Sequence, residues 1–303
     1  MLQQHVSFRD AYALRRRIEN AGDSACAGRE IATSLMDPAL KSVLVISDGI
    51  RVNGAELVRG MNEVLPSSVV VTGGLAGDGD RFQRTWVIAQ GRPAADRISA
   101  VGFYGDRIHV AHGSKGGWDP FGPQRVVTRS QGNVVFEIDG LPALALYKEY
   151  LGDRAAGLPA TALLFPLGLV DTTPGAPPLV RTILSIDESG QSMTFAGDVP
   201  QGHRVQLMRG VFGRLVDGAA AAGREAASSV RDGAPGLAIA ISCVGRRLVL
   251  GQRAEDEVEA AREALPASAS LVGFYSYGEI SPSGFGPCSL HNQTMTLTHF
   301  QEI

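Results

Sequence analysis

Two segments of the chain repeat the same order of apolar and polar positions. Residues 41–47 (KSVLVIS) form a continuous apolar run, residues 53–64 have helical spacing and end before Pro66, and residues 68–72 (SVVVT) form a second run. Apolar runs rich in β-branched residues indicate strands buried on both faces, and two such runs joined by a helix are typical of a βαβ unit. Residues 236–243, 254–264 and 269–274 follow the same order.

The two copies also correspond at particular residues. Ser47 corresponds to Ser242, and Leu65-Pro66 corresponds to Leu265-Pro266, just before the second strand of each copy. We interpret this correspondence as an internal duplication. In both copies a glycine-containing loop follows the second strand, and ligands of α/β proteins bind at the carboxyl ends of strands.

Other stretches predict shorter elements, and the chain length bears on the number of domains. We expect helices at residues 24–35, 143–151 and 211–229, strands at 134–138 and 179–186, a hairpin over 97–112 that turns at Gly105 and Asp106, a turn at 118–123, and a connecting segment at 152–180. A chain of 303 residues exceeds the usual size of one domain. The predicted fold class is α/β, with two α/β domains (residues 1–170 and 171–303) that contain duplicated βαβ units and mixed sheets.

Charge and cysteine content narrow the functions that the chain can have. Lys and Arg total 28 against 31 Asp and Glu, and neither sign forms a long block, so the sequence does not predict binding to nucleic acid. No apolar stretch is long enough to span a membrane and no signal peptide is visible, which predicts a cytoplasmic protein with no membrane segment. The cysteines, Cys26, Cys243 and Cys288, are odd in number and far apart, which argues against disulfides and a C-x-x-C metal site.

The glycine-rich stretch at residues 73–80 (GGLAGDGD) follows a predicted strand, where it could hold a ligand. Its spacing matches neither G-x-G-x-x-G nor a P-loop, so a nucleotide site is not favoured. Asp78 and Asp80 could bind a metal ion, but acidic residues in glycine turns usually cap the backbone.

An enzyme would need an activated nucleophile, and the chain has no G-x-S-x-G motif. Cys243 ends a predicted strand and precedes two arginines, which could lower its thiol pKa, although a buried apolar role is the simpler interpretation. Cys288 lies three residues before His291 in a glycine-rich loop. A cysteine-dependent enzyme that uses Cys243 or Cys288 is therefore the rival hypothesis, and a binding protein without catalysis is the preferred one.

Residues near the C-terminal end form the clearest candidate site. Tyr275, Tyr277 and Glu279 alternate along a predicted strand and would give an aromatic recess with one carboxylate, which suits a small molecule. Residues 291–300 also alternate, with His291 on one face and threonines on the other, and the threonine face is expected to meet solvent or neighbouring threonines. His291 could ligate a metal or haem, bind a carboxylate, or be a structural imidazole.

The residues that carry these patterns resemble a known family. The stretches ISCVGRRLVLGQR, GFYSYGEISP and HNQTMTL resemble the FIST C-terminal domain, and VLVISDGIRVNG with VTGGLAGDG resembles the FIST N-terminal domain. The resemblance to the FIST (F-box and intracellular signal transduction) family implies a sensory module of prokaryotic signal transduction that binds a small ligand such as an amino acid; some relatives are described as haem proteins that respond to nitric oxide. It implies a pocket that includes Gly73, Gly74, Gly77, Asp78, Cys243, Arg246, Tyr277, Glu279, His291 and Asn292.

We therefore expect a cytoplasmic sensor that binds a small-molecule ligand between its two domains, in a pocket formed by residues 73–80 and 274–292. The haem-binding alternative uses His291 as the ligand of the iron. The FIST N domain usually begins with a further strand and helix, so we expect either a truncated start or a strand supplied by a second subunit of a homodimer. No kinase, cyclase or receptor segment is visible, so the signal is expected to pass to a separate histidine kinase, cyclase or other signalling protein.

Overall fold

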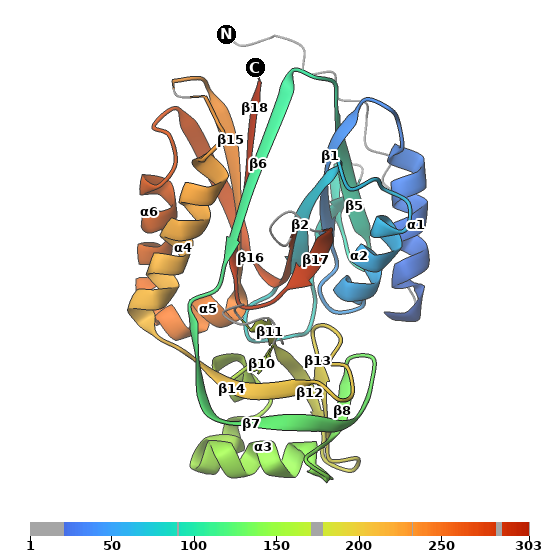
Figure 1. Ribbon diagram of the computed structural model, residues 1–303, viewed down its shortest axis with the longest axis vertical. Coiled ribbons are helices and arrows are strands. Elements are labelled where there is room, and N and C mark those ends of the chain that lie inside the picture. The colour runs from blue at the N-terminus through green and yellow to red at the C-terminus, as the bar shows by residue number, and fades with distance from the viewer. Residues whose placement is uncertain (1–20, 90, 171–177, 232, 283–286, 303) are drawn as a thin grey trace.

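The computed structural model describes residues 21–89, 91–170, 178–231, 233–282 and 287–302. Within these residues the strands form two large sheets, one above the other in Figure 1, and a small two-stranded ribbon. The strands of the first sheet lie in the order β5 (Ile98–Tyr104), β1 (Leu40–Ser47), β2 (Val70–Ala76), β16 (Ala269–Pro282), β15 (Gly236–Cys243), β18 (Met295–Glu302) and β6 (Ile108–Lys115). A further strand, β17 (Cys288–His291), pairs with the end of β16.

The first sheet confirms the predicted duplication. β1 is parallel to β2 and antiparallel to β5, just as β15 is parallel to β16 and antiparallel to β18. Equivalent turns precede the second strands, because Val69 donates to the carbonyl of Pro66 and Ala269 donates to that of Pro266, both at 3.0 Å. The two copies meet where β2 pairs antiparallel with β16, so they share one mixed sheet.

Helices pack on the first sheet beside each copy. α1 (Ser24–Leu35) and α2 (Gly54–Asn62) lie beside the first copy, and α4 (Phe212–Ala227), α5 (Val244–Leu250) and α6 (Ala254–Glu263) beside the second (Figure 1). Gly28 lets α1 approach α2, because a Cβ atom there would lie 2.2 Å from the carbonyl oxygen of Leu57. None of the helices in the described part of the chain combines the length and the apolarity needed to cross a bilayer.

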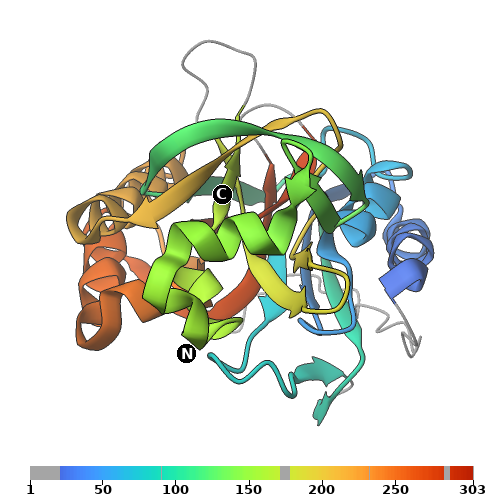
Figure 2. The ribbon, with the colours of Figure 1, turned by 90° about the horizontal axis from the view of Figure 1, so that it is seen from below.

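The second sheet is antiparallel and lies at the end of the first sheet where β15 passes into α5 (Figure 1). Its strands lie in the order β11 (Leu179–Arg181), β10 (Leu167–Leu169), β14 (Arg204–Gly210), β7 (Trp118–Gln131), β8 (Val134–Ile138), β13 (Ser192–Phe195) and β12 (Ile183–Asp187), and β9 (Leu141–Pro142) pairs with β8. α3 (Ala143–Leu151) packs on this sheet around a separate apolar core, as Figure 2 shows from below. The ribbon consists of β3 (Val87–Ala89) and β4 (Arg92–Ala94).

The strands before residue 170 and the strands after it both contribute to both sheets. The first sheet combines β1, β2, β5 and β6 with β15 to β18, and the second combines β7 to β10 with β11 to β14. The segment expected to connect two domains contains β10, while residues 171–177 of that segment lie outside the described residues. The division of the chain near residue 170 into two folding units stays a prediction.

The hairpin expected over residues 97–112 is wrong in its pairing. β5 and β6 are joined by a short turn at Gly105, but β5 pairs with β1 and β6 pairs with β18. The connection of residues 105–107 can span only about 14 Å, so the edges of the first sheet must approach each other at this end. Phe103 of β5 accordingly stacks on Phe300 of β18, with ring centroids 4.5 Å apart.

Two further local predictions are wrong. Residues 118–123 begin the long strand β7 instead of forming a turn, and Gly122 and Pro123 lie at an irregularity in its pairing with β14. The strand expected over residues 291–300 is broken after His291 by a turn in which Gln293 has a φ of 64°. Thr296 and Thr298 are buried between β15 and β6 rather than exposed to solvent.

Candidate ligand-binding site

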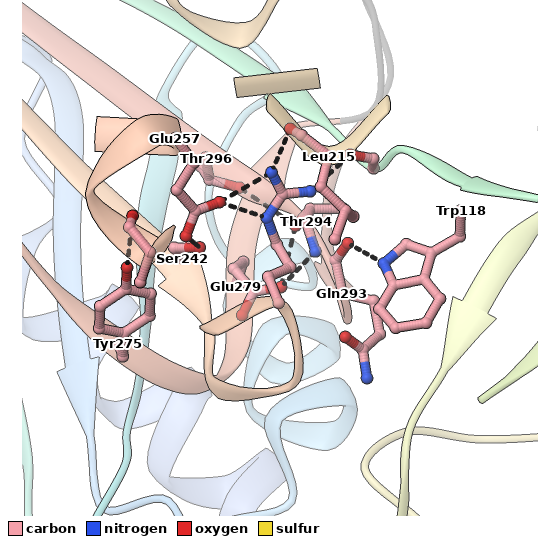
Figure 3. Close-up of polar contacts among 12 residues, drawn as sticks. Trp118, Leu215, Ser242, Glu257, Tyr275, Glu279, Gln293, Thr294 and Thr296 are labelled. Carbon is pink, nitrogen blue, oxygen red and sulfur yellow. Dashed lines mark hydrogen bonds and ion pairs between the residues drawn. The ribbon is translucent and has the colours of Figure 1, made fainter. Parts of the chain in front are cut away.

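Polar side chains lie where β2 and β16 bring the two repeated units together within the first sheet. Glu279 on β16 is fully buried, and its carboxyl contacts the hydroxyl of Ser276. The same carboxyl accepts hydrogen bonds from the backbone nitrogen and the hydroxyl of Thr294, at 3.1 and 2.9 Å (Figure 3). Ser276 donates to the backbone carbonyl of Ser242 at 3.2 Å. This polar junction therefore ties β16 to β15 and to the turn before β18.

The protonation state of Glu279 explains how the junction satisfies its hydrogen bonds. Burial raises the pKa of Glu279 to about 8, although the bonds from Ser276 and Thr294 and the charge of Arg246 act in the opposite direction. The carboxyl is therefore mostly protonated at neutral pH. A protonated carboxyl can donate to the Ser276 oxygen, which leaves the Ser276 hydrogen for the carbonyl of Ser242. Glu279 thus acts as a neutral hydrogen-bonding group.

Arg246 forms a fully buried ion pair with Glu257 of α6, at 2.9 Å (Figure 3). Its terminal nitrogens also donate to the backbone carbonyls of Gly116 and Leu215, at 2.5 and 2.7 Å. Ser242 donates to the other oxygen of Glu257 at 2.9 Å. Every nitrogen of the guanidinium is bonded to a protein group, so Arg246 links α5, α6 and the start of α4.

The glycines of residues 73–80 serve the pairing of strands. Gly73 and Gly74 belong to β2, where they pair with β1 on one side and β16 on the other. Gly73 has a φ of 150°, and a Cβ atom there would lie 1.8 Å from the carbonyl oxygen of Val45. A Cβ at Gly77 would lie 3.0 Å from the carbonyl oxygen of Tyr275. These glycines allow β1, β2 and β16 to lie close together.

Asp78 caps the loop that follows β2. Its carboxylate accepts hydrogen bonds from the backbone nitrogens of Gln83 and Arg84, at 3.0 and 2.9 Å, and from the hydroxyl of Tyr277. The Tyr277 ring stacks on Phe82 with centroids 4.4 Å apart. Tyr277 therefore bonds to this loop and Glu279 to the polar junction, so the two side chains do not form one wall of a recess.

Both candidate nucleophiles are buried thiols. Cys243 is 2% exposed at the end of β15, and Cys288 is 7% exposed at the start of β17. Burial raises the pKa of both thiols well above the usual value, and the nearby Arg246 only partly offsets this for Cys243. A raised pKa keeps a thiol protonated, which is the opposite of what an activated cysteine needs. The structure gives no support to the cysteine-dependent enzyme.

His291 ends β17 and is partly buried. Burial lowers the pKa of His291 to about 4, and the charge of Arg181 contributes, so the imidazole is neutral at physiological pH. Its Nε2 lies 3.1 Å from the carbonyl oxygen of Ser281, which can only accept a hydrogen bond. Nε2 is therefore engaged with the backbone, and the haem-binding alternative stays a hypothesis. The described residues also contain no group of three or more His, Cys, Asp or Glu that could hold a metal ion.

The turn after β17 connects the two sheets. Gln293 is fully buried, and its side-chain nitrogen donates to the Leu163 carbonyl and the Thr182 hydroxyl, at 3.1 and 3.0 Å. Its backbone carbonyl accepts from the Trp118 indole at 2.9 Å (Figure 3). The side-chain oxygens of Asn292 and Gln293 are buried without a hydrogen-bond partner among the described residues. The turn is thus held by the second sheet and its neighbouring segments.

A groove of about 350 Å³ lies beside this turn, between α2, β17 and β11. We call it the α2–β17 groove. Its lining combines apolar, polar and charged side chains: Ala55, Val58, Arg59, Asn62, Glu63, Arg181, Cys288, Ser289 and Leu290. Of these, only residues 288–290 fall inside the predicted pocket segments.

A second cavity, of about 270 Å³, adjoins the α2–β17 groove. It is lined by the end of α2, the start of β2, Pro282, Pro287 and His112. Asn62 and Cys288 belong to the walls of both hollows, and the Asn62 side chain donates to the Cys288 carbonyl at 2.7 Å. This hydrogen bond therefore joins α2 to β17 where the two hollows approach each other.

Arg181 is the groove residue that sequence reasoning missed although a signal was present. It stands in the stretch LVRTIL, where a positive charge interrupts an apolar run. A charge inside a buried strand requires a partner or a ligand. Asn62 gave no such signal, because a polar residue near a helix end is ordinary.

These observations define an α/β protein with a groove between its two sheets. Comparison with protein families is consistent with this class: a model of the FIST N domain matches residues 4–141, and a model of the FIST C domain matches residues 143–282. The chain belongs to the FIST family. FIST domains are sensory domains of signal transduction. No curated protein matches the chain.

Proposed function

We propose that this protein is a cytoplasmic sensor that binds a small molecule of about the size of an amino acid in the α2–β17 groove. The observation that carries the proposal is the position of the groove. Its walls come from α2 of the first copy, β17, which follows the second copy along the chain, and β11 of the second sheet. A ligand held there contacts three parts of the structure at once.

The size and lining of the groove suit a small ligand. Binding sites for small molecules usually enclose about 300–1,000 Å³, with apolar walls and a few fixed polar groups. The groove, at about 350 Å³, lies at the lower end of this range. Val58 and Leu290 supply apolar wall, and Asn62 and Arg181 supply polar groups.

The contacts around β17 offer a route from ligand to output. β17 pairs with β16 through Glu279 and His291, and it continues into the turn that Gln293 ties to the second sheet. A ligand that binds one arrangement of α2, β17 and β11 more tightly than another shifts the population toward that arrangement. Residues that the sequence predicted for the pocket, such as Glu279, then hold β17 in place through its pairing with β16. The altered surface would be recognised by a separate histidine kinase, cyclase or other signalling protein.

A thermal-shift screen on the full chain tests the proposal, with the common amino acids, small carboxylates and their amides as probes. A ligand at about 100 times its dissociation constant adds about 2.7 kcal/mol to stability. Ala55→Phe places an aromatic ring in the groove from α2 and should abolish the shift. Ser34→Phe introduces the same aromatic residue at an exposed position of α1 and should leave the shift intact. A probe that stabilises Ala55→Phe as strongly as the wild type would refute the groove as the ligand site.

A further inference from the structure

Arg181 is a buried cation whose hydrogen bonds are incomplete. It ends β11 and is 7% exposed. Its Nε donates to the Asp198 carbonyl at 3.2 Å, and Nη1 donates to the Leu290 carbonyl at 3.0 Å. Nη2 has no hydrogen-bond partner among the described residues, and the side chain lines the α2–β17 groove. The guanidinium is therefore fixed in orientation and retains donor capacity.

No carboxylate of the described residues forms a direct ion pair with this charge. Among the described residues, no carboxylate oxygen lies within 4.0 Å of the Arg181 nitrogens. Burial lowers the pKa of Arg181 to about 10, and the more distant charge of Asp198 acts in the opposite direction. Arg181 thus stays protonated at neutral pH. A buried charge with two carbonyl contacts and only a more distant carboxylate is incompletely compensated, and an anion in the groove would pair with it directly.

The surroundings leave room for this side chain. A Cβ atom at Gly197 would lie 3.0 Å from Nε and 3.1 Å from Cζ of Arg181, so glycine permits the flat guanidinium to lie here. The other cation of the groove, Arg59, is about half exposed and is already paired with Glu56 and Glu63. Among the described residues of the groove lining, Arg181 is therefore the cation without a direct ion pair.

We propose that the ligand of the α2–β17 groove is a small organic carboxylate, whose charged group accepts hydrogen bonds from Nη2 of Arg181 while its carbon chain lies against Val58 and Leu290. This inference rests on the proposed function, since it names the ligand class of that same site. Hydrogen bonds between a guanidinium and a carboxylate are stronger than those between neutral groups, so the carboxylate fixes the orientation of the ligand.

Isothermal titration calorimetry on the full chain tests this inference with pentanoate and leucine, and with pentanamide and leucinamide as matched amides. At least one of the carboxylates should bind about tenfold or more tightly than its amide. Arg181→Gln should remove this preference, and Arg181→Lys should retain part of it because the charge remains. Arg59→Gln removes the exposed, already paired cation of the same groove and should change affinity only slightly.

Equal affinities for each carboxylate and its amide, an unchanged affinity in Arg181→Gln, or no binding of either carboxylate would overturn the inference. If Arg181→Gln does not fold, the inference is tested by the affinities for carboxylates and amides in the wild type and in Arg181→Lys. Ala55→Phe separates this inference from the proposed function. If carboxylates and amides bind the wild type equally and neither binds Ala55→Phe, the groove stands as the ligand site. Only the preference for a carboxylate is then refuted. Unchanged carboxylate binding by Ala55→Phe refutes the groove itself.

Discussion

Glu279→Gln is expected to stabilise the protein at alkaline pH and to change its stability little in acid. In the folded protein, burial raises the pKa of Glu279 to about 8 from the ordinary value of 4.5 that applies to the unfolded chain. Below pH 4.5 the carboxyl is protonated in both states and resembles the glutamine that replaces it. Above pH 4.5 the unfolded chain loses this proton first, which favours unfolding of the wild type alone.

The contribution of Glu279 to stability is therefore fully present below pH 4.5 and is lost as the pH rises through about 8. Each pH unit in this window corresponds to about 1.36 kcal/mol. The wild type should lose on the order of 4–5 kcal/mol relative to the variant between these two pH values. Glutamine preserves the neutral network, because its amide can donate to Ser276 and accept from Thr294.

Urea unfolding followed by circular dichroism, at about pH 5, 7 and 9, gives the free energy of unfolding of both proteins. Glu259 is an exposed glutamate of α6, and Glu259→Gln serves as the control whose effect should not vary over this range. A difference between wild type and Glu279→Gln that stays constant with pH would refute the reasoning. It would mean that Glu279 is already ionised in the folded protein at neutral pH.

Two further substitutions test the packing around the polar junction. Arg246→Met should lower the free energy of unfolding by about 3–5 kcal/mol, because it leaves the buried Glu257 without its counter-ion. Adding Glu257→Leu should recover much of this loss in urea unfolding, and the absence of any recovery would contradict the account. Gly73→Ala should lower the melting temperature more than Gly79→Ala. Both glycines have positive φ, but only at Gly73 would a Cβ meet the Val45 carbonyl, and equal effects would argue against this contact.

The elements with strong local patterns could be predicted from the sequence. β15, β8, α1 and α3 have the expected bounds, because apolar periodicity and breaking residues act within a few positions. The pairing of β6 with β18 could not be predicted, since it joins residues nearly two hundred positions apart and competes with a nearby hairpin. β7 was missed because a strand can accept Gly122 and Pro123 at an irregularity, which local propensity does not reveal.

The candidate site could be predicted from the sequence only in part. The stretch of residues 274–292 does contain one wall of the groove, β17. The opposite walls, from α2 and Arg181, depend on the order of strands in the sheets and on how the second sheet meets the first. The neutral state of Glu279 likewise follows from complete burial, a property of the assembled fold. The sequence shows that a carboxyl is present but not whether it carries a charge.

The two matched family domains meet at residue 142, yet neither sheet stops there. A chain severed at this point would still be held together by the ladders that join β2 to β16, β6 to β18, and β7 to β14. Two fragments produced as separate polypeptides should therefore find each other and complement, as halves of a split protein do. Exchange of one half between family members would succeed only where these strand edges remain compatible.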